Sequence, residues 1–322
     1  MNNPILSICI PTYNRATYLE DTINSIVTQK RFQETNDVEI VISDNCSGDN
    51  TREVAQKFTA VFDDKIRYYK NAENIKDANY EKVLSYGIGI FLKLNNDTLP
   101  HQEGSLDYLI AQINYNSTKK PILFFTNGFI AEIQYYKYCT NLDSFVSQVS
   151  YFVTWIGAFG IWKEDFSNLK NFNRYSHLSL VQVDVMFRLI KLKNSVVIDN
   201  KILFNGVTPA RKNGYDFLTV FLDNYFFILN EQYLEGELRK KTFDIEKKRV
   251  LLKYICYYLV KIKVLNHQYQ FDVGNANSKI LHHYKKYPLL LSFFYLKYIM
   301  YYLYFIIKMK DVFHKKTIHF LI

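Results

Sequence analysis

The chain has 322 residues, and its 48% hydrophobic and 22% charged residues are those of a globular protein large enough to bury a core without staples. Its four cysteines lie far apart with no C-x-x-C pair, which argues against a zinc site and a disulfide framework and favours a reducing compartment. The formal net charge of +9 is uneven, because residues 237–322 hold 17 Lys and Arg against 5 Asp and Glu. The N-terminus lacks the basic segment and long apolar run of a secretory signal, so we expect a cytoplasmic protein.

Residues 1–215 alternate strand and helix patterns. Apolar, β-rich runs bounded by turn residues predict strands at 5–10, 38–44, 65–71 and 88–95. Apolar residues at helical spacing predict helices between them, at 16–29, 51–62 and 79–87. This order is typical of βαβ units, so we expect an α/β domain with a mainly parallel sheet flanked by helices. Further strands are expected in 121–129, 195–199 and 202–206, and a helix in the second half of 177–192.

Three of these strands end in polar loops, with the sequences PTYNR (11–15), SDNCSGD (43–49) and NNDT (95–98). The carboxyl ends of parallel strands lie on one edge of the sheet, and ligands bind in the crevice outside that edge. We therefore expect the three loops to converge on one binding site.

The side chains in the first two loops suit a phosphorylated ligand that carries an aromatic ring. Tyr13 can cover a nucleobase, and Arg15 can pair with a phosphate. Asp44, at the end of its own strand, can accept hydrogen bonds from a pyrimidine. The alternatives are local: Asn14 or Thr17 would cap the first helix, and the second loop would be an Asx-rich turn that caps the next one.

The segments SICIPTYNRATYLEDTINSI (7–26) and VEIVISDNCSGDNT (38–51) closely resemble the opening of the family 2 inverting glycosyltransferases. The SDN form resembles the bacterial branch that includes the abequosyltransferases of O-antigen synthesis. The resemblance extends more loosely to about Asn205 and implies a Rossmann-like GT-A domain at 1–215. It also implies a nucleotide pocket lined by Pro11, Thr12, Tyr13, Arg15, Asp44, Asn79 and Asn96.

The NNDT loop falls where that family carries its acidic D-x-D metal motif, but it keeps one carboxylate. Mn²⁺ and Mg²⁺ take oxygen ligands, and one carboxylate can hold them together with substrate phosphates and waters. We expect Asp97 and Asn95 to bind such a divalent cation weakly, while Asn96 contributes an amide oxygen or a hydrogen bond to the sugar. A metal-independent or inactive protein is the alternative.

The family's catalytic base is an acidic residue ahead of an apolar helix that contains Arg, and QVDVMFRLIK (182–191) has this form. The resemblance assigns the base to Asp184, which is also the only acid between positions 165 and 199. A plain i,i+4 ion pair between Asp184 and Arg188 is the alternative reading. His177 is the competing base.

The segment TWIGAFGIWKEDF (154–166) resembles the family's acceptor segment ahead of the base. Its two tryptophans can stack on sugar rings, although buried tryptophans usually belong to a core. We expect Trp155, rather than Trp162, to bind the acceptor.

Residues 216–322 change to apolar and basic runs with few turn residues, which predicts a helical extension. Within it, residues 287–310 are apolar and tyrosine-rich, interrupted by Lys297 and flanked by lysines, which suits a membrane interface better than its core. We expect contact with an anionic membrane surface. Packing on the catalytic domain, or a homodimer through these helices, is the alternative. Nucleic acid is not expected, because the basic residues interleave with aliphatic ones and no binding motif for it is present.

Together these expectations describe an inverting glycosyltransferase. It would move a sugar from a nucleotide-sugar donor to a hydroxyl of a glycan or lipid-linked glycan of the bacterial surface, such as O-antigen, lipooligosaccharide or capsule. Its place would be the inner face of the cytoplasmic membrane. The reduced metal motif favours an alternative, a noncatalytic sugar-nucleotide-binding or scaffolding subunit of a glycan assembly complex.

Overall fold

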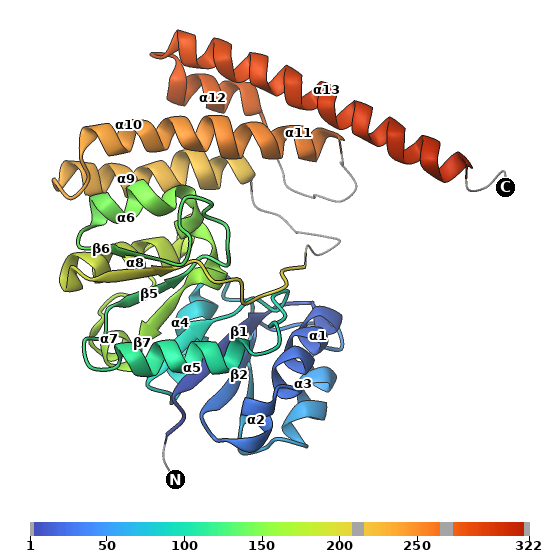
Figure 1. The fold of residues 1–322 in the computed structure, drawn as a ribbon, viewed down its shortest axis with the longest axis vertical. Coiled ribbons are helices and arrows are strands. Elements are labelled where there is room, and N and C mark those ends of the chain that lie inside the picture. The colour runs from blue at the N-terminus through green and yellow to red at the C-terminus, as the bar shows by residue number, and fades with distance from the viewer. Residues whose placement is uncertain (1–2, 208–215, 265–272, 319–322) are drawn as a thin grey trace. The chain divides into compact units, whose positions relative to one another are not determined.

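The computed structural model describes residues 3–207, 216–264 and 273–318. The chain divides into two compact units, Met1–Pro209 (unit 1) and Ala210–Ile322 (unit 2) (Figure 1). The domain boundary expected after residue 215 falls at the end of segment 208–215, outside the described residues, and stays a prediction.

Unit 1 is built on a five-stranded sheet in the order β3-β2-β1-β4-β7. Its strands are β1 (Leu6–Thr12), β2 (Val38–Asp44), β3 (Ile66–Lys70), β4 (Phe91–Leu94) and β7 (Gly160–Trp162). The first four strands are parallel, and β7 runs antiparallel to β4. The mainly parallel sheet predicted from the sequence is therefore confirmed.

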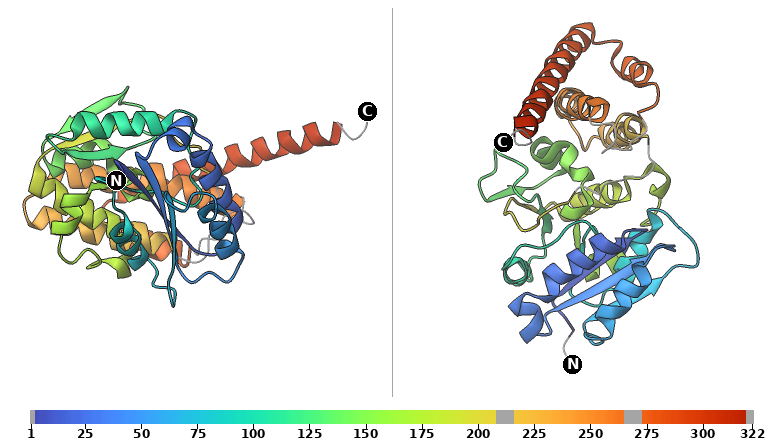
Figure 2. Two further views of the ribbon diagram at one scale, coloured as in Figure 1. Left: turned by 90° about the horizontal axis from the view of Figure 1, so that it is seen from below. Right: turned by 90° about the vertical axis from the view of Figure 1, so that its right-hand side faces the viewer.

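Helices lie on both faces of this sheet (Figure 2). They are α1 (Ala16–Val27), α2 (Lys30–Glu34), α3 (Thr51–Thr59), α4 (Ala78–Tyr86) and α5 (Ser105–Asn116). Buried apolar side chains fill the space between sheet and helices, among them Ile8 and Ile40 of the sheet and Ile23 and Leu109 of the helices. Each such side chain contributes about 1.5–3 kcal/mol relative to an exposed one, so the core fixes the ends of the strands firmly.

A second sheet of unit 1 has the order β5-β8-β6, from β5 (Ile122–Phe125), β8 (Val196–Asp199) and β6 (Tyr136–Cys139). Around it lie α6 (Leu142–Val149), α7 (Lys163–Asn168), α8 (Val181–Lys193) and three 3₁₀ turns, η1 (Ser150–Thr154), η2 (Ile156–Ala158) and η3 (Ser176–Leu178).

The prediction of a strand in 202–206 is wrong. Phe204 makes only an isolated β-bridge to His101, because residues 203–207 bond to the loop at 98–102 instead of a sheet: the amides of Asn205 and Val207 donate to the carbonyls of Pro100 and Thr98. This pairing braces the loop that follows β4.

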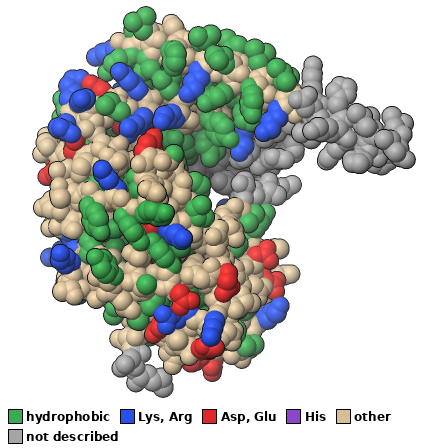
Figure 3. Space-filling view, viewed as in Figure 1, with side chains coloured by type: hydrophobic (Ala, Val, Ile, Leu, Met, Phe, Trp, Pro, Cys, Tyr) green, Lys and Arg blue, Asp and Glu red, His purple; other side chains and the backbone are tan. Residues whose placement is uncertain are grey.

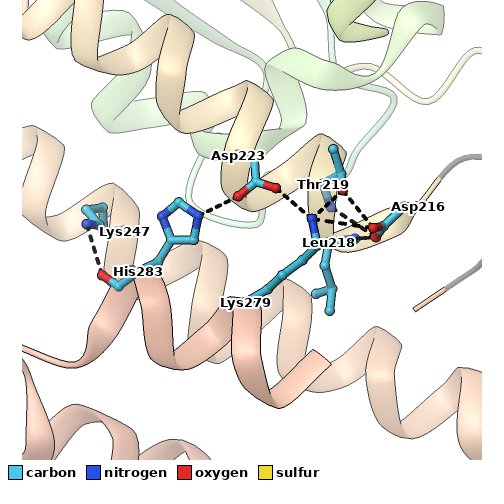
Figure 4. Close-up of polar contacts among 7 residues, drawn as sticks. All are labelled: Asp216, Leu218, Thr219, Asp223, Lys247, Lys279 and His283. Carbon is cyan, nitrogen blue, oxygen red and sulfur yellow. Dashed lines mark hydrogen bonds and ion pairs between the residues drawn. The ribbon is translucent and has the colours of Figure 1, made fainter. Parts of the chain in front are cut away.

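The described part of unit 2 is helical, as expected. Its elements are the π-helical η4 (Thr219–Asn224), α9 (Tyr225–Leu234), α10 (Lys240–Arg249), the π-helical η5 (Val250–Ile255), α11 (Cys256–Val264), α12 (Ala276–Tyr284) and α13 (Pro288–Ile318). A half-buried polar cluster holds α12 on η4 (Figure 4). In it, Asp223 accepts a 2.7 Å bond from Lys279 Nζ and lies 2.6 Å from His283 Nε2.

Candidate active site

The loops after β1 and β4 meet at the carboxylate of Asp97. Thr12 Oγ1 donates to Asp97 Oδ2 at 2.9 Å, and Arg15 Nη1 donates to Asp97 Oδ1 at 3.0 Å. The carboxylate is buried, with 3% of its side chain exposed, while one third of the Arg15 side chain reaches solvent. Burial raises the pKa of the Asp97 carboxyl, against the opposing effects of Arg15, Thr12 and the backbone amide of Tyr13. The geometry therefore joins a predicted metal ligand to two predicted nucleotide contacts.

The loops after β1 and β2 are bonded to each other as well. Asn14, in a left-handed conformation with φ of 51°, donates its amide to Ser47 Oγ at 2.9 Å and accepts from the amide of Gly48 at 2.8 Å. Asp49 accepts from the amides of Ala16 and Thr51, so one carboxylate serves the first turns of both α1 and α3. The cap of α1 by Asn14 or Thr17 is therefore not formed, because Asp49 accepts from the first amide of α1 instead, while the expected Asx-rich turn at the start of α3 coexists with the clustering of the loops.

Asp44 ends β2 inside this cluster. Its Oδ1 accepts from the amide of Ser47 at 2.8 Å, and its Oδ2 accepts from the hydroxyl of Tyr68 at 2.7 Å. Burial and that bond raise the pKa of Tyr68. Pro11 lies opposite Ser43 and Thr12 opposite Asp44 in the strand register, and Tyr13, the next residue, is 44% exposed. Contact of Tyr13 and Asp44 with a base stays a prediction.

Asn79 lies beneath the β2 loop. Its Oδ1 accepts from Ser43 Oγ at 2.6 Å and from Asn71 Nδ2 at 2.9 Å, and its Nδ2 donates to the carbonyl of Ser43 at 3.0 Å. It is buried, and these bonds pin the start of α4 to the end of β2. The bonds describe a brace for the loop, and direct nucleotide contact by Asn79 stays a prediction.

Asn95, predicted as a metal ligand, has partners for all its polar atoms. Its Nδ2 donates to the carbonyls of Asn96 and Leu99, and its Oδ1 lies 3.2 Å from His101 Nε2. Burial, with a smaller contribution from the charge of Lys93, lowers the pKa of His101 to about 3, so the ring is neutral at physiological pH. These bonds shape the turn that carries Asp97.

Asn96 differs from Asn95, because its Oδ1 is buried and has no hydrogen-bond partner within the part of the chain that the structure describes. An unpaired buried amide oxygen and the carboxylate of the next residue are ligands of the kind that a hard cation takes. Over the described ranges, no group of three or more His, Cys, Asp or Glu side chains is arranged to hold a metal. Binding of a divalent ion by Asp97 and Asn96, with most of its ligands from the substrate and water, stays a prediction.

Lys93 is a buried lysine that sequence analysis missed. It lies on β4, two residues before Asn95, and its Nζ donates to the carbonyls of Leu94 at 3.1 Å and Gly157 at 2.5 Å. The ring of Phe204 lies 4.8 Å from the same nitrogen. Burial lowers the pKa of Lys93 to about 7. A charged residue inside the apolar run FLKL was the signal of this link between β4 and the expected acceptor segment.

Asp184, the predicted base, is buried in the first turn of α8 with 1% of its side chain exposed. Its Oδ1 accepts from Arg174 Nε at 2.9 Å and Nη2 at 2.6 Å, and its Oδ2 accepts from Arg188 Nε at 3.0 Å. The i,i+4 ion pair with Arg188 is therefore present, and Arg174 is a partner that no sequence signal indicated. The competing base His177 lies exposed on η3, next to Tyr175.

The two tryptophans have different surroundings. Trp162 is buried on β7, and its Nε1 donates to the carbonyl of Pro121 at 2.6 Å. Trp155 is half-buried and packs edge to face on Phe129 at 5.2 Å between ring centroids. This difference agrees with the choice of Trp155 for the acceptor, which stays a prediction. A cavity of about 830 Å³ lies elsewhere in unit 1, between Gln102–Tyr108, Gly128–Tyr135 and Asn200–Leu203, and no predicted site residue lines it.

Residues 7–119 match the family model described as glycosyl transferase family 2. This segment is a family 2 glycosyltransferase domain. It contains the Thr12, Arg15 and Asp97 cluster and the loop of Asp44, and it ends before Trp155 and Asp184. The family resemblance seen in the sequence is therefore confirmed for the loops after β1, β2 and β4.

Curated relatives of this segment include bacterial glycosyltransferases. The abequosyltransferase RfbV of Salmonella typhimurium is 41% identical over 86 residues, which are 26% of this chain and 25% of that protein. A GalNAc(5)-diNAcBac-PP-undecaprenol beta-1,3-glucosyltransferase of Campylobacter jejuni is 34% identical over 114 residues, or 34% of this chain and 35% of that protein. The chain thus spans a quarter to about a third of these relatives.

Solved structures share the fold over more of the chain. TarS 1–349 of S. aureus, in complex with UDP-GlcNAc, has a TM-score of 0.57 at 14% identity and covers 92% of this chain and 89% of that one. Mannosyltransferase PcManGT of Pyrobaculum calidifontis, in complex with GDP-Man and Mn²⁺, has a TM-score of 0.54 at 11% identity, over 94% and 88% of the two chains. At these identities the likeness concerns the fold alone, and it confirms the GT-A fold that the sequence predicted.

Proposed function

We propose that the protein is an inverting glycosyltransferase. It transfers a sugar from a nucleotide-sugar donor to a hydroxyl of a bacterial surface glycan intermediate, such as O-antigen, lipooligosaccharide or capsule. The observation that carries the proposal is the convergence of Thr12, Arg15 and Asp97 at the carboxyl edge of a family 2 glycosyltransferase domain.

The donor binds across the ends of β1, β2 and β4. Asp44 and Tyr13 hold the base, Pro11 and Asn79 shape the pocket around it, and Arg15 pairs with the diphosphate. The exposed third of the Arg15 side chain supports this role, because the guanidinium can reach a phosphate while its charge stays close to Asp97. Thr12 holds the Asp97 carboxylate in place from the opposite side.

Asp97 and the amide oxygens of Asn96 or Asn95 would hold a divalent cation, Mn²⁺ or Mg²⁺. When bound, that cation would neutralise the charge that develops on the departing nucleoside diphosphate. Of the two amides, the Oδ1 of Asn96 is the one without a competing partner among the described residues.

Asp184 takes the proton of the acceptor hydroxyl. The hydroxyl oxygen forms a bond to the anomeric carbon, the bond from that carbon to the diphosphate oxygen breaks on the opposite face, and the proton moves to Asp184. Since Arg174 and Arg188 occupy both carboxylate oxygens, the acceptor must displace one of these bonds, and the more exposed Arg174 is the one we expect to yield. Trp155 stacks on the acceptor sugar.

The acceptor is a glycan or lipid-linked glycan at the inner face of the cytoplasmic membrane. The Campylobacter jejuni relative supports this choice, since its name describes an undecaprenol-linked acceptor. Among the described residues, one stretch of helix, Pro288–Lys308 of α13, is long and apolar enough to cross a bilayer.

A thermal-shift screen with UDP-, GDP-, dTDP- and CDP-sugars tests donor binding, because a ligand that binds only the folded state raises the melting temperature. We expect one nucleotide class to stabilise the wild type and to lose most of its effect on Arg15→Ala. Equal behaviour of wild type and variant with all four classes would contradict the donor assignment.

A noncatalytic sugar-nucleotide-binding or scaffolding subunit is the second candidate, favoured by the single carboxylate of the NNDT loop and its ion pair with Arg15. It predicts donor binding that is unaffected by Mn²⁺ in calorimetry and no turnover of any donor. The transferase predicts tighter donor binding with Mn²⁺.

A further inference from the structure

One face of α13 is a row of exposed apolar side chains. It consists of Leu289, Phe293, Leu296, Met300, Leu303 and Ile307, each between 53% and 86% exposed. Steps of four and three residues keep these positions on one side of a helix. Figure 3 shows hydrophobic side chains gathered along α13, with Lys and Arg side chains beside them. Below, "the apolar row" means these six residues.

The opposite face of α13 is already packed within unit 2. Phe294 is 2% exposed, and the ring of Tyr257 on α11 contacts Tyr301 and Phe305 at centroid distances of 6.2 and 6.0 Å. Lys263 of α11 lies over Tyr298 at 5.4 Å. A helix held on one side by α11 leaves its other side for a separate partner.

The length and packing of the helix decide its orientation toward a bilayer. The apolar stretch Pro288–Lys308 has 21 residues, or about 31 Å of helix, which is enough to span a hydrocarbon core. A spanning α13 would have to leave α11 and bury Lys297 near the centre of the membrane. Lying in the plane keeps α11 in place, because only the apolar row then enters lipid.

Side chains at the border of the row suit a lipid interface. Ile299, Tyr302 and Tyr304 are also exposed and make the apolar face wider than a coiled-coil seam. Lys297 Nζ lies over the ring of Tyr301 at 5.3 Å and Lys308 Nζ over that of Tyr304 at 5.9 Å, so two lysines lie on phenol rings along this border. Tyrosine and lysine at the edge of an apolar face are typical of helices at membrane interfaces.

The charge of this region favours a lipid surface over a second copy of this chain as the partner of the apolar row. Leu289, Leu296 and Leu303 recur every seven residues, which would also suit a paired helix. Pairing would bring together two segments 237–322 that each carry 17 basic against 5 acidic residues, and these would repel each other. Anionic lipid headgroups attract the same charge.

We propose that α13 lies in the plane of an anionic lipid surface, with the apolar row in the lipid and its opposite face retained on α11. This inference refines the membrane location given under the proposed function, and it does not depend on the chemistry at Asp97 or Asp184.

Vesicle sedimentation of the full chain tests the inference, with vesicles of phosphatidylglycerol and phosphatidylethanolamine compared with phosphatidylcholine alone. The variant Leu296→Asp/Leu303→Asp places two charges in the apolar row. The matched control, Val61→Asp/Leu234→Asp, places the same charges at side chains 69% and 74% exposed on other parts of the chain. Leu296→Ser/Leu303→Ser serves as a second variant should the aspartates lower expression.

We expect the wild type to bind the anionic vesicles, the control to bind within about twofold of it, and the row variants to bind at least about tenfold more weakly.

An alkaline carbonate wash should release the bound wild type, whereas retention would indicate a spanning helix and overturn the in-plane orientation. Unchanged binding of both row variants would overturn the assignment of the face. A wild-type dimer in analytical ultracentrifugation that the row variants convert to monomer would assign the row to a second copy instead. Donor hydrolysis in vesicle-free buffer, equal in all variants, separates failure of this inference from failure of the proposed function.

Discussion

Arg15 Nη1 lies 3.0 Å from Asp97 Oδ1, and this ion pair joins the loop after β1 to the loop after β4. The pair places the cationic group expected to bind the diphosphate directly on the carboxylate expected to bind the cation. In the absence of donor, we therefore expect the guanidinium and a metal ion to compete for Asp97. A bound diphosphate should remove the competition, because it would attract Arg15 and supply further metal ligands.

This competition predicts the order of binding. Mn²⁺ alone should bind the wild type weakly, and the cognate nucleoside diphosphate should tighten Mn²⁺ binding by about tenfold or more. Arg15→Ala should bind Mn²⁺ alone more tightly than the wild type but bind the nucleotide more weakly, both measured by calorimetry. Lys30→Ala, which removes an exposed lysine of α2, is the control and should change neither affinity. Weaker binding of Mn²⁺ alone to Arg15→Ala would contradict the competition.

Asp184→Asn should separate catalysis from donor binding. The asparagine keeps the shape of the side chain but cannot take a proton, so turnover should fall about 10²–10⁴-fold. Donor affinity, which depends on the β1, β2 and β4 loops, should stay within about twofold of wild type by calorimetry. Full turnover by Asp184→Asn would leave the buried Arg174 and Arg188 pairs with a purely structural role.

Arg174→Ala supplies the matching comparison. Loss of its two bonds to Asp184 should destabilise the fold by about 2 kcal/mol in urea unfolding. If the acceptor displaces Arg174 during catalysis, this variant should keep measurable turnover where Asp184→Asn does not. Inactivity of Arg174→Ala at a temperature where it is fully folded would contradict this displacement and show that catalysis requires the guanidinium.

The sequence was sufficient for the sheet and for the donor-side loops because their signals are local. Each strand before PTYNR, SDN and NNDT is a short apolar run, and parallel order alone brings their ends to one edge. The internal bonding of the site could not be predicted in this way. The NNDT sequence does not indicate that Asn95 bonds to His101 while the Oδ1 of Asn96 has no partner among the described residues, because this difference depends on the fold of residues 99–105.

Arg174 is a clearer example of what the sequence hides. It lies ten positions before Asp184, outside any helical or strand spacing, and meets the carboxylate only through the turn at η3. The strand wrongly expected at 202–206 has a similar cause. The run ILFNG has the composition of a strand, but its partner is an irregular loop that contains Pro100, so no ladder forms.

The buried Lys93 should make the free energy of unfolding depend on pH. Its pKa falls from about 10.5 in the unfolded chain to about 7 in the fold, so above pH 7 the unfolded state binds more protons than the folded one. Stability should therefore rise as pH increases from about 7 toward 10, by an amount on the order of 4 kcal/mol. Urea unfolding at intervals over this range measures the rise.

Lys93→Met should remove most of that dependence, while Lys137→Met, at an exposed position of β6, should preserve it. Deprotonation of other groups adds to both curves, so the difference between the two variants is the informative quantity. Parallel curves for the two variants would mean that Lys93 is not the group responsible.

The cluster that holds α12 on η4 should weaken in acid (Figure 4). Burial lowers the pKa of His283 despite the nearby Asp223, so its stabilising contribution is complete above about pH 6.5 and is lost as pH falls through the lowered pKa. The melting temperature should fall between pH 7 and pH 5 in the wild type and fall less in His283→Gln. A steeper fall in His283→Gln would reverse the assignment.

The most direct test of the transferase assignment is the release of nucleoside diphosphate from the stabilising sugar nucleotide, with Mn²⁺, by wild type, Asp97→Asn and Asp184→Asn. The account predicts turnover by the wild type and, because both carboxylates act on the reacting groups, a loss of at least about 100-fold in each variant. Both variants should remain folded at the assay temperature. Turnover by Asp97→Asn and Asp184→Asn at the wild-type rate would contradict the account.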